Sequence, residues 1–172
     1  MKKLEKILIV LSLIGIAMKL VPVAGGATIT VFGILLLALL YILFGFALFN
    51  GIRFRDIFKK RAYTGVKTSH ILMSAFCGIC LFFLLMGIMF KIQAWLGAAI
   101  ELFSSSVLTT ILFIACLIWY LSSPQQFLKN IFYRAVPLLV IALALYVTPS
   151  EKLVHILHST PDVTQKVVDG RR

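Results

Sequence analysis

Long apolar runs separated by short polar segments make up most of this chain. A helix needs about 20 mostly apolar residues to cross the hydrocarbon core of a bilayer. Four runs approach or exceed that length, at 7–23, 27–49, 71–90 and 102–120. The pattern therefore predicts an all-α fold, a polytopic membrane helical bundle.

A fifth apolar run, 135–147, is short for a span. Pro137 suits the first turn of a helix that begins there. Residues 127–133 extend this helix if Lys129 and Arg134 reach up to the headgroups. Two alternatives remain open: five spans, or four spans with a re-entrant or interfacial segment. In the first, 122–148 forms a short fifth membrane helix.

The composition agrees with a membrane protein. The chain has 172 residues, of which 61% are hydrophobic and only 13% charged, whereas a soluble domain carries about 25% charged residues. The apolar content excludes a disordered chain, and three cysteines do not make a disulfide scaffold. The bilayer is therefore the first partner that we predict.

Basic residues follow the apolar runs in alternation. Lysines precede the first run, a basic segment separates the second from the third, and Lys129 and Arg134 follow the fourth. The intervening loops, near 21–30 and 92–101, hold only Glu101, with Lys19 and Lys91 at their edges. The positive-inside rule then places the N-terminus in the cytoplasm. With five spans, the tail 149–172 lies on the side of the membrane away from the cytoplasm. This tail starts as an amphipathic segment and is otherwise polar.

The segment 51–70 predicts a basic cytoplasmic loop. Phe54, Ile57 and Phe58 share one helical face, which suits a short interfacial helix on anionic lipid. The basic residues expected to contact that lipid are Arg53, Arg55, Lys59, Lys60 and Arg61. The alternative is a plain positive-inside loop. Because these charges adjoin the membrane, we expect no nucleic-acid partner.

An internal repeat is visible at a constant offset of 72 residues. Gly15, Lys19 and Gly25 recur as Gly87, Lys91 and Gly97, within similar apolar surroundings. Each copy predicts a transmembrane hairpin, the first over 1–50 and the second over 71–121. The first run also resembles a signal peptide, but its counterpart is internal, so we expect an uncleaved helix.

The repeated residues have a structural interpretation and a functional one. Gly15 and Gly87 allow close helix packing, while Gly25 and Gly97 suit the turns. Lys19 and Lys91 sit where a lysine favours the helix C-terminus and reaches outward to phosphate. Alternatively, one or both lysines point into the bundle and meet Glu101 or a substrate. The interfacial aromatic residues that we expect at the headgroup level are Trp95, Trp119 and Tyr120.

The second copy carries a recognisable pattern, Phe90-Lys91-Ile92-Gln93-Ala94-Trp95-Leu96-Gly97-Ala98. It resembles the first transmembrane hairpin of the gliding-motility and type IX secretion motor protein of Bacteroidota, and of that protein's small uncharacterised relatives. The family has a His where this chain has Ala94 and a Pro where it has Leu96. The resemblance covers about 30 residues per copy.

The resemblance implies a bacterial inner membrane. In the motor protein, the hairpin lysine and an acid deep in the next helix are associated with proton flow, and Lys91 matches that lysine. Residues 103–120 contain no acid, and the family's cytoplasmic coiled domain is missing. Kinship with the small relatives is therefore the better inference.

Little else in the sequence indicates chemistry. Cys77-x-x-Cys80 lies within an apolar run, where thiols are inert core residues. His155-x-x-His158 fits a surface helix better than a metal site. We predict no cofactor, no metal and no enzymatic activity.

Three functional hypotheses follow. The first is a non-enzymatic assembly or accessory component of a membrane complex, with a second copy or other membrane subunits as helix partners. The second is a channel, transporter or proton-coupled subunit that uses Lys19, Lys91 and Glu101. The third is an intramembrane thiol-redox protein.

Overall fold

The computed structural model describes residues 1–21 and 23–149. Five α-helices follow one another, and no strand occurs among the described residues. They are α1 (Lys2–Leu20), α2 (Gly26–Phe49), α3 (Thr68–Gln93), α4 (Ala98–Ser122) and α5 (Gln126–Val147). The predicted all-α class is confirmed. Apart from Pro149, the tail predicted over 149–172 lies outside the described residues, as do the side chains of Lys2 and Lys60.

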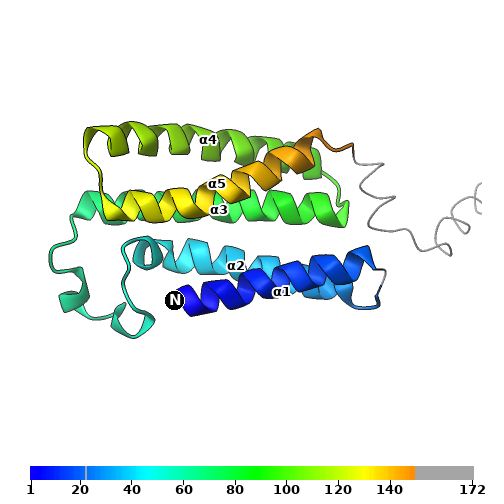
Figure 1. The fold of residues 1–172 in the computed structure, drawn as a ribbon, viewed down its shortest axis with the longest axis horizontal. Coiled ribbons are helices and arrows are strands. Elements are labelled where there is room, and N and C mark those ends of the chain that lie inside the picture. The colour runs from blue at the N-terminus through cyan, green and yellow to red at the C-terminus, as the bar shows by residue number, and fades with distance from the viewer. Residues whose placement is uncertain (22, 150–172) are drawn as a thin grey trace, which may run out of the picture.

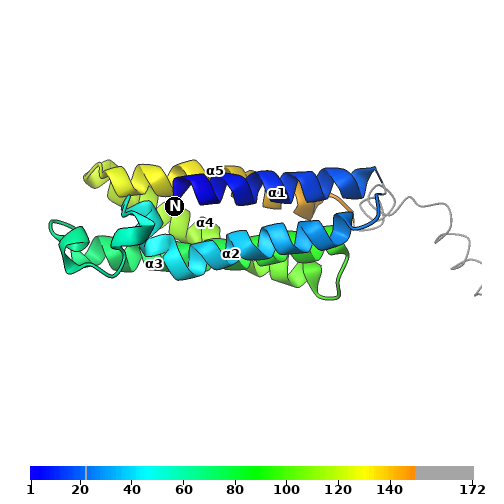
Figure 2. The ribbon, with the colours of Figure 1, turned by 90° about the horizontal axis from the view of Figure 1, so that it is seen from below.

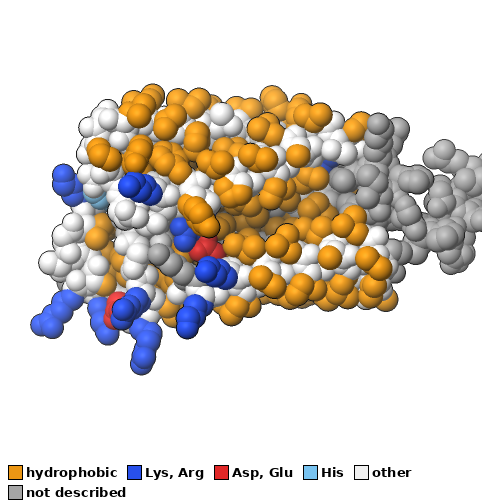
Figure 3. Space-filling model, viewed as in Figure 1, with side chains coloured by type: hydrophobic (Ala, Val, Ile, Leu, Met, Phe, Trp, Pro, Cys, Tyr) orange, Lys and Arg blue, Asp and Glu red, His pale blue; other side chains and the backbone are white. Residues whose placement is uncertain are grey.

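The helices run along a common axis in alternating directions (Figures 1 and 2). The two hairpins, α1–α2 and α3–α4, meet through α2 and α3, and α5 packs on α3 and α4. The short hairpin turns lie at one end, which we call the turn end. The N-terminus, the α2–α3 loop and the α4–α5 connection lie at the other (Figure 1). Figure 3 shows Lys and Arg gathered there, so we call it the basic end.

Four described helices, α2 to α5, are long and apolar enough to cross a membrane. The short fifth run therefore becomes a 22-residue helix, because α5 begins at Gln126 and continues through Arg134. The first run, predicted as a span, is not among the four. Its helix carries five charged residues, which are Lys2, Lys3, Glu5, Lys6 and Lys19. It nevertheless packs lengthwise against α2 (Figure 2).

The hairpins approach each other closely where two glycines face each other. A Cβ added to Gly78 in α3 would lie 2.4 Å from the Tyr41 carbonyl oxygen in α2. A Cβ added to Gly45 would lie 3.0 Å from Gly78 Cα. Small residues let membrane helices pack backbone to backbone, where the apolar solvent gives no hydrophobic driving force. The interface between the two hairpins therefore depends on this pair, which the repeat pattern does not contain.

The two hairpin turns have matching hydrogen bonds at the offset of 72. Val23 N donates to the Met18 oxygen at 2.9 Å, and Trp95 N donates to the Phe90 oxygen at 3.0 Å. Gly25 and Gly97 precede α2 and α4 with φ of 89° and 80°, which only glycine adopts without strain. These positions, 72 residues apart in the two hairpins, therefore have similar backbone geometry.

Gly15 and Gly87 also occupy equivalent places. A Cβ on Gly15 would lie 2.5 Å from the Thr30 nitrogen, and one on Gly87 would lie 2.9 Å from Leu102 Cα. Thr30 and Leu102 are themselves 72 positions apart. Each glycine thus sets the close crossing of the two helices within its own hairpin.

The α2–α3 loop differs from the interfacial helix proposed for 51–70. It forms two short 3₁₀ turns, η1 (Phe54–Asp56) and η2 (Lys60–Tyr63). Ile57, expected to face lipid, is instead buried with Ala47 and Ile52. Tyr63 Oη donates to the Ile57 oxygen at 2.7 Å and holds the loop folded back. Internal packing of Ile57 therefore prevents a continuous amphipathic helix.

The Gly78 crossing gives a first prediction. Gly78→Ala should lower the free energy of unfolding by about 1–3 kcal/mol, because backbone atoms of α2 must move to make room. Titration with SDS in mixed micelles, followed by circular dichroism, measures this energy. Ala115→Leu, which adds more volume on the exposed face of α4, is the matched control and should change little. Equal stability of Gly78→Ala and the native chain would contradict the close crossing.

Candidate functional site

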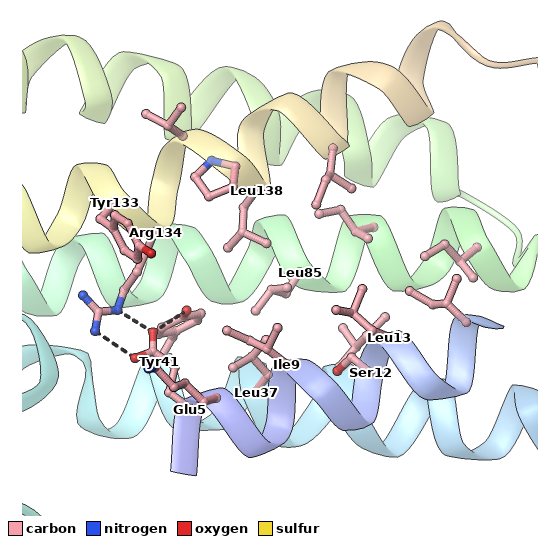
Figure 4. Close-up of a pocket in the computed structure, with 18 of the residues that line it drawn as sticks. Glu5, Ile9, Ser12, Leu13, Leu37, Tyr41, Leu85, Tyr133, Arg134 and Leu138 are labelled. Atoms are coloured by element: carbon pink, nitrogen blue, oxygen red, sulfur yellow. Dashed lines mark hydrogen bonds and ion pairs between the residues drawn. The ribbon is translucent and has the colours of Figure 1, made fainter. Parts of the chain in front are cut away.

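A buried ion cluster joins three helices near the basic end (Figure 4). Arg134 of α5 binds Glu5 of α1 through two hydrogen bonds, Nε to Oε1 and Nη2 to Oε2, the latter at 2.8 Å. Tyr41 Oη of α2 donates to the same Oε1 at 2.9 Å. The side chains of Arg134 and Glu5 are 9% and 7% exposed. The carboxylate therefore receives three donors from two other helices.

A further set of contacts orients the guanidinium. Its Nη1 donates to the Asn130 carbonyl oxygen at 2.8 Å, and Asn130 Nδ2 donates to the Phe49 oxygen at 2.8 Å. The ring of Phe49 lies 5.7 Å from the Arg134 Cζ and stacks on Tyr41. The planar fork of arginine suits such bidentate binding. Glu5 is thus the charged partner that Arg134, an ionisable group inside a membrane bundle, requires.

Sequence reasoning missed this cluster. Arg134 was expected to reach the headgroups, but it turns inward to Glu5, 129 positions away in the sequence. One signal was present: Glu5 is the only acidic residue before Asp56 and lies within a lysine-rich segment. A lone acid at the start of one helix and a lone arginine inside another were candidates for a pair.

An apolar groove of about 740 Å³ begins at this cluster and runs between α1 and α5. Ile9, Leu13 and Ile16 line its α1 wall, and Leu37 and Leu85 contribute from α2 and α3. Figure 3 shows the hollow between the two halves of the molecule, with acidic and basic side chains at one end and hydrophobic ones along it. The charged groups that line it are Glu5, Lys6 and Arg134.

Pro137 contributes to the groove, although not from the predicted place. It lies well inside α5 rather than in its first turn. Proline lacks an N–H and disrupts the helix around it, which bends helices at such positions. The second half of α5 slants from α3 towards α4 (Figure 1), and Tyr146 packs on Phe103 with ring centroids 5.8 Å apart. The slant takes α5 away from α1 and leaves the groove open.

Lys19 ties the hairpins together at the turn end. Its Nζ donates to the Ile92 carbonyl oxygen at 2.7 Å and to Gln93 Oε1 at 2.8 Å. Gln93 Nε2 donates in turn to the Ala27 oxygen at 3.1 Å. The lysine was expected at the C-terminus of its own helix, reaching outward. It is 6% exposed and instead caps the C-terminus of α3, where positive charge is favourable.

Lys91 and Glu101 lie near the same end. Lys91, in the last turn of α3, is 6% exposed like Lys19. Glu101 lies in the first turn of α4, where a carboxylate is favourable to the helix dipole. Its backbone oxygen accepts a hydrogen bond from Ser105 Oγ at 2.7 Å. Use of Lys91 and Glu101 in transport stays a prediction.

The three aromatic residues expected at the headgroup level lie at opposite ends. Trp95, in the second hairpin turn, is 46% exposed and packs edge-on against Phe90 at 5.1 Å. Trp119 and Tyr120 lie near the basic end, where α4 finishes. Trp119 contacts Phe127 of α5 at 5.7 Å, and Tyr120 contacts Phe132 of α5 at 5.6 Å. These two rings therefore also join α4 to α5.

The thiols cluster in the core of the second hairpin. Cys77 Sγ and Cys116 Sγ lie 3.8 Å apart across α3 and α4, a contact that the Cys77-x-x-Cys80 spacing does not reveal. Each of the three thiols is at most 1% exposed. Among the described residues, no group of three His, Cys, Asp or Glu side chains is arranged to hold a metal ion.

The basic loop presents its charges to the surroundings. The side chains of Arg53, Arg55, Lys59 and Arg61 are exposed. A hydrogen bond from Lys59 Nζ to Asp56 Oδ1, 2.9 Å long, lowers the pKa of Asp56 below its ordinary value. The expected contact with anionic lipid stays a prediction.

A scan of protein-family models found no match for this chain, and neither did searches of curated proteins and of solved structures.

The ion cluster gives a second prediction. Removing one member of a buried pair leaves the other charge unpaired, so Arg134→Gln and Glu5→Gln should each cost about 3–5 kcal/mol of stability. The double variant Glu5→Gln/Arg134→Gln should cost much less than the sum. SDS titration of the four chains in mixed micelles gives the coupling energy.

The exposed pair of Lys59 and Asp56 supplies the control for this cycle. Its side chains are 67% and 34% exposed, and such pairs stabilise little. Lys59→Ala should therefore leave the unfolding curve in place. Additive effects of the Glu5 and Arg134 substitutions would contradict the pairing.

Proposed function

We propose that this chain is a non-enzymatic multipass membrane protein that serves as an assembly or accessory component of a membrane complex. The main support for this proposal is that buried ionisable side chains bind other helices of the same bundle. Glu5 and Arg134 bind each other, and Lys19 caps α3. These groups hold helices together, which is the role expected in a rigid scaffold.

The two matching hairpin turns support the same proposal. Their equivalent hydrogen bonds and glycines suit a duplicated hairpin that supplies two similar walls of one scaffold. Both chain directions are the same in the two copies, so an axis near the membrane normal would relate them. The resemblance to the motor protein's small relatives extends this to a bacterial inner membrane with the N-terminus in the cytoplasm.

Exposed apolar helix surfaces offer places for membrane partners. The outward face of α4 carries large side chains at helical spacing, and the most exposed of them are Ile100, Ile111, Ile118 and Leu121. A second copy of this chain or another membrane subunit is the partner that we propose, and nucleic acid is not.

The alternatives have less support. A proton-coupled subunit that uses Lys19 needs this lysine to exchange its proton with water, whereas the Lys19 ammonium donates to Ile92 and Gln93. A thiol-redox protein needs a sulfur that an electron acceptor can touch, and burial of Cys77, Cys80 and Cys116 prevents this contact.

Purification and flux measurements together test the proposal. From native membranes in mild detergent, a tagged chain should elute in a complex of fixed composition, larger than the 19.2 kDa chain in its micelle. In liposomes, an imposed proton gradient should collapse no faster than in protein-free vesicles. Lys19→Met should lower stability by about 1.5–3 kcal/mol through loss of its charged hydrogen bonds.

Lys67→Met, at an exposed position beside α3, is the control and should leave stability unchanged. A proton flux through the native chain that Lys19→Met or Lys91→Met abolishes, and Lys67→Met does not, would favour the proton-coupled alternative. Elution as a lone chain in mild detergent would contradict the accessory role.

A further inference from the structure

We infer that the groove between α1 and α5 is a binding site for one anionic phospholipid of the leaflet at the basic end. The acyl chains would lie along the apolar walls, and the phosphate would lie beside Lys6. This inference is independent of the accessory role, because it concerns the bilayer's own molecules. Four properties of the groove lead to it: its length, its width, the distribution of its polar groups and its net charge.

The length of the groove matches one leaflet. On α1 its lining extends from Glu5 to Ile16, and on α5 it extends from Asn130 to Ile141. With a rise of about 1.5 Å per residue, both walls are about 16 Å long. The hydrocarbon core of a bilayer is about 30 Å thick, so one leaflet contributes about 15 Å.

The width of the groove leaves room for acyl chains. Its 740 Å³ spread over a length of about 16 Å gives a mean cross-section of about 45 Å². Flexible hydrocarbon chains can occupy a space of this size, and the crosslinking experiment below tests whether a partner helix occupies it instead.

The polar groups of the groove gather at one end, where the headgroup of an amphiphile would lie. Lys6, Asn130 and Tyr133 lie with the Glu5–Arg134 pair near the basic end. Farther along, the lining is apolar except for Ser12, whose hydroxyl already donates to the Leu8 oxygen at 2.8 Å. A molecule that is polar at one end and hydrocarbon for the rest complements this lining.

The net charge of the lining selects an anionic headgroup. Lys6 and Arg134 contribute two positive charges and Glu5 one negative charge, which leaves +1. Arg134 is neutralised by Glu5, so the Lys6 ammonium on the exposed side is the group available to a phosphate. The hydroxyl of Tyr133, 84% exposed and drawn beside Arg134 in Figure 4, can donate to the same headgroup.

The experiment uses the full chain, reconstituted in vesicles of equal parts phosphatidylglycerol and phosphatidylcholine. After extraction in mild detergent, native mass spectrometry counts the retained lipids. The native chain should retain one phosphatidylglycerol. Leu13→Trp fills the groove and should abolish retention. Val10→Trp, on the same helix outside the groove and 54% exposed against 58% for Leu13, should retain lipid like the native chain.

A pair of variants on α5 replaces Leu13→Trp if that chain does not fold. Circular dichroism and gel filtration would show whether it folds. Ile141→Trp should likewise abolish retention, while its control Leu143→Trp, outside the groove on α5, should not. Lys6→Gln should keep a lipid but reduce the preference for phosphatidylglycerol about fivefold, the effect of one basic residue near the surface. Lys3→Gln, outside the groove, should keep the preference.

Three outcomes would overturn the inference. The first is retention of lipid by both groove-filling variants at the native level. The second is equal retention of the two lipids by the native chain. The third is crosslinking of Leu13→Cys to another polypeptide, or to a second copy, in the membrane. In each case, the size and composition of the complex purified from native membranes in mild detergent would still test the accessory role separately.

Discussion

The buried ion pair between Glu5 and Arg134 is the constraint on which the arrangement of α1 and α5 depends. Among the described residues, it supplies the hydrogen bonds that link these two helices directly. An unpaired charge in an apolar interior is costly, so each partner requires the other. Tyr41 adds α2 to the same carboxylate. The pair thus ties the two walls of the groove together near the basic end.

The same pair explains how α1 and α5 hold charges inside an apolar bundle. Hydropathy weighs each helix alone, so α1 is penalised for its five charged residues, and a long α5 was expected to need Lys129 and Arg134 at the headgroups. Once the two charges neutralise each other inside the bundle, α1 can pack along α2 and α5 can continue from Gln126 to Val147. A polar contact between residues 129 positions apart is invisible to any window along the sequence.

Much of the fold was nevertheless predictable, because it follows from local pattern. Apolar runs of helical length predict the all-α class and the spans of α2, α3 and α4. Gly25 and Gly97 mark turns because their positive φ is a local requirement. Lys19 was identified as a candidate functional residue, but its hydrogen bond to the Ile92 carbonyl oxygen depends on how the hairpins pack. The groove depends on three-dimensional placement in the same way, since the slant of α5 after Pro137 opens it.

The distance between α1 and α5 tests most directly the claim that this pair positions them. Spin labels on Val10→Cys and Val140→Cys, at positions 54% and 60% exposed, report it by pulsed electron resonance. The native thiols are buried, so labelling is confined to the introduced cysteines. With Glu5 and Arg134 intact, we expect one narrow distance distribution, and with Arg134→Gln a broader and longer one. An unchanged distribution in the Arg134→Gln chain would contradict the claim that the ion pair positions α1 and α5.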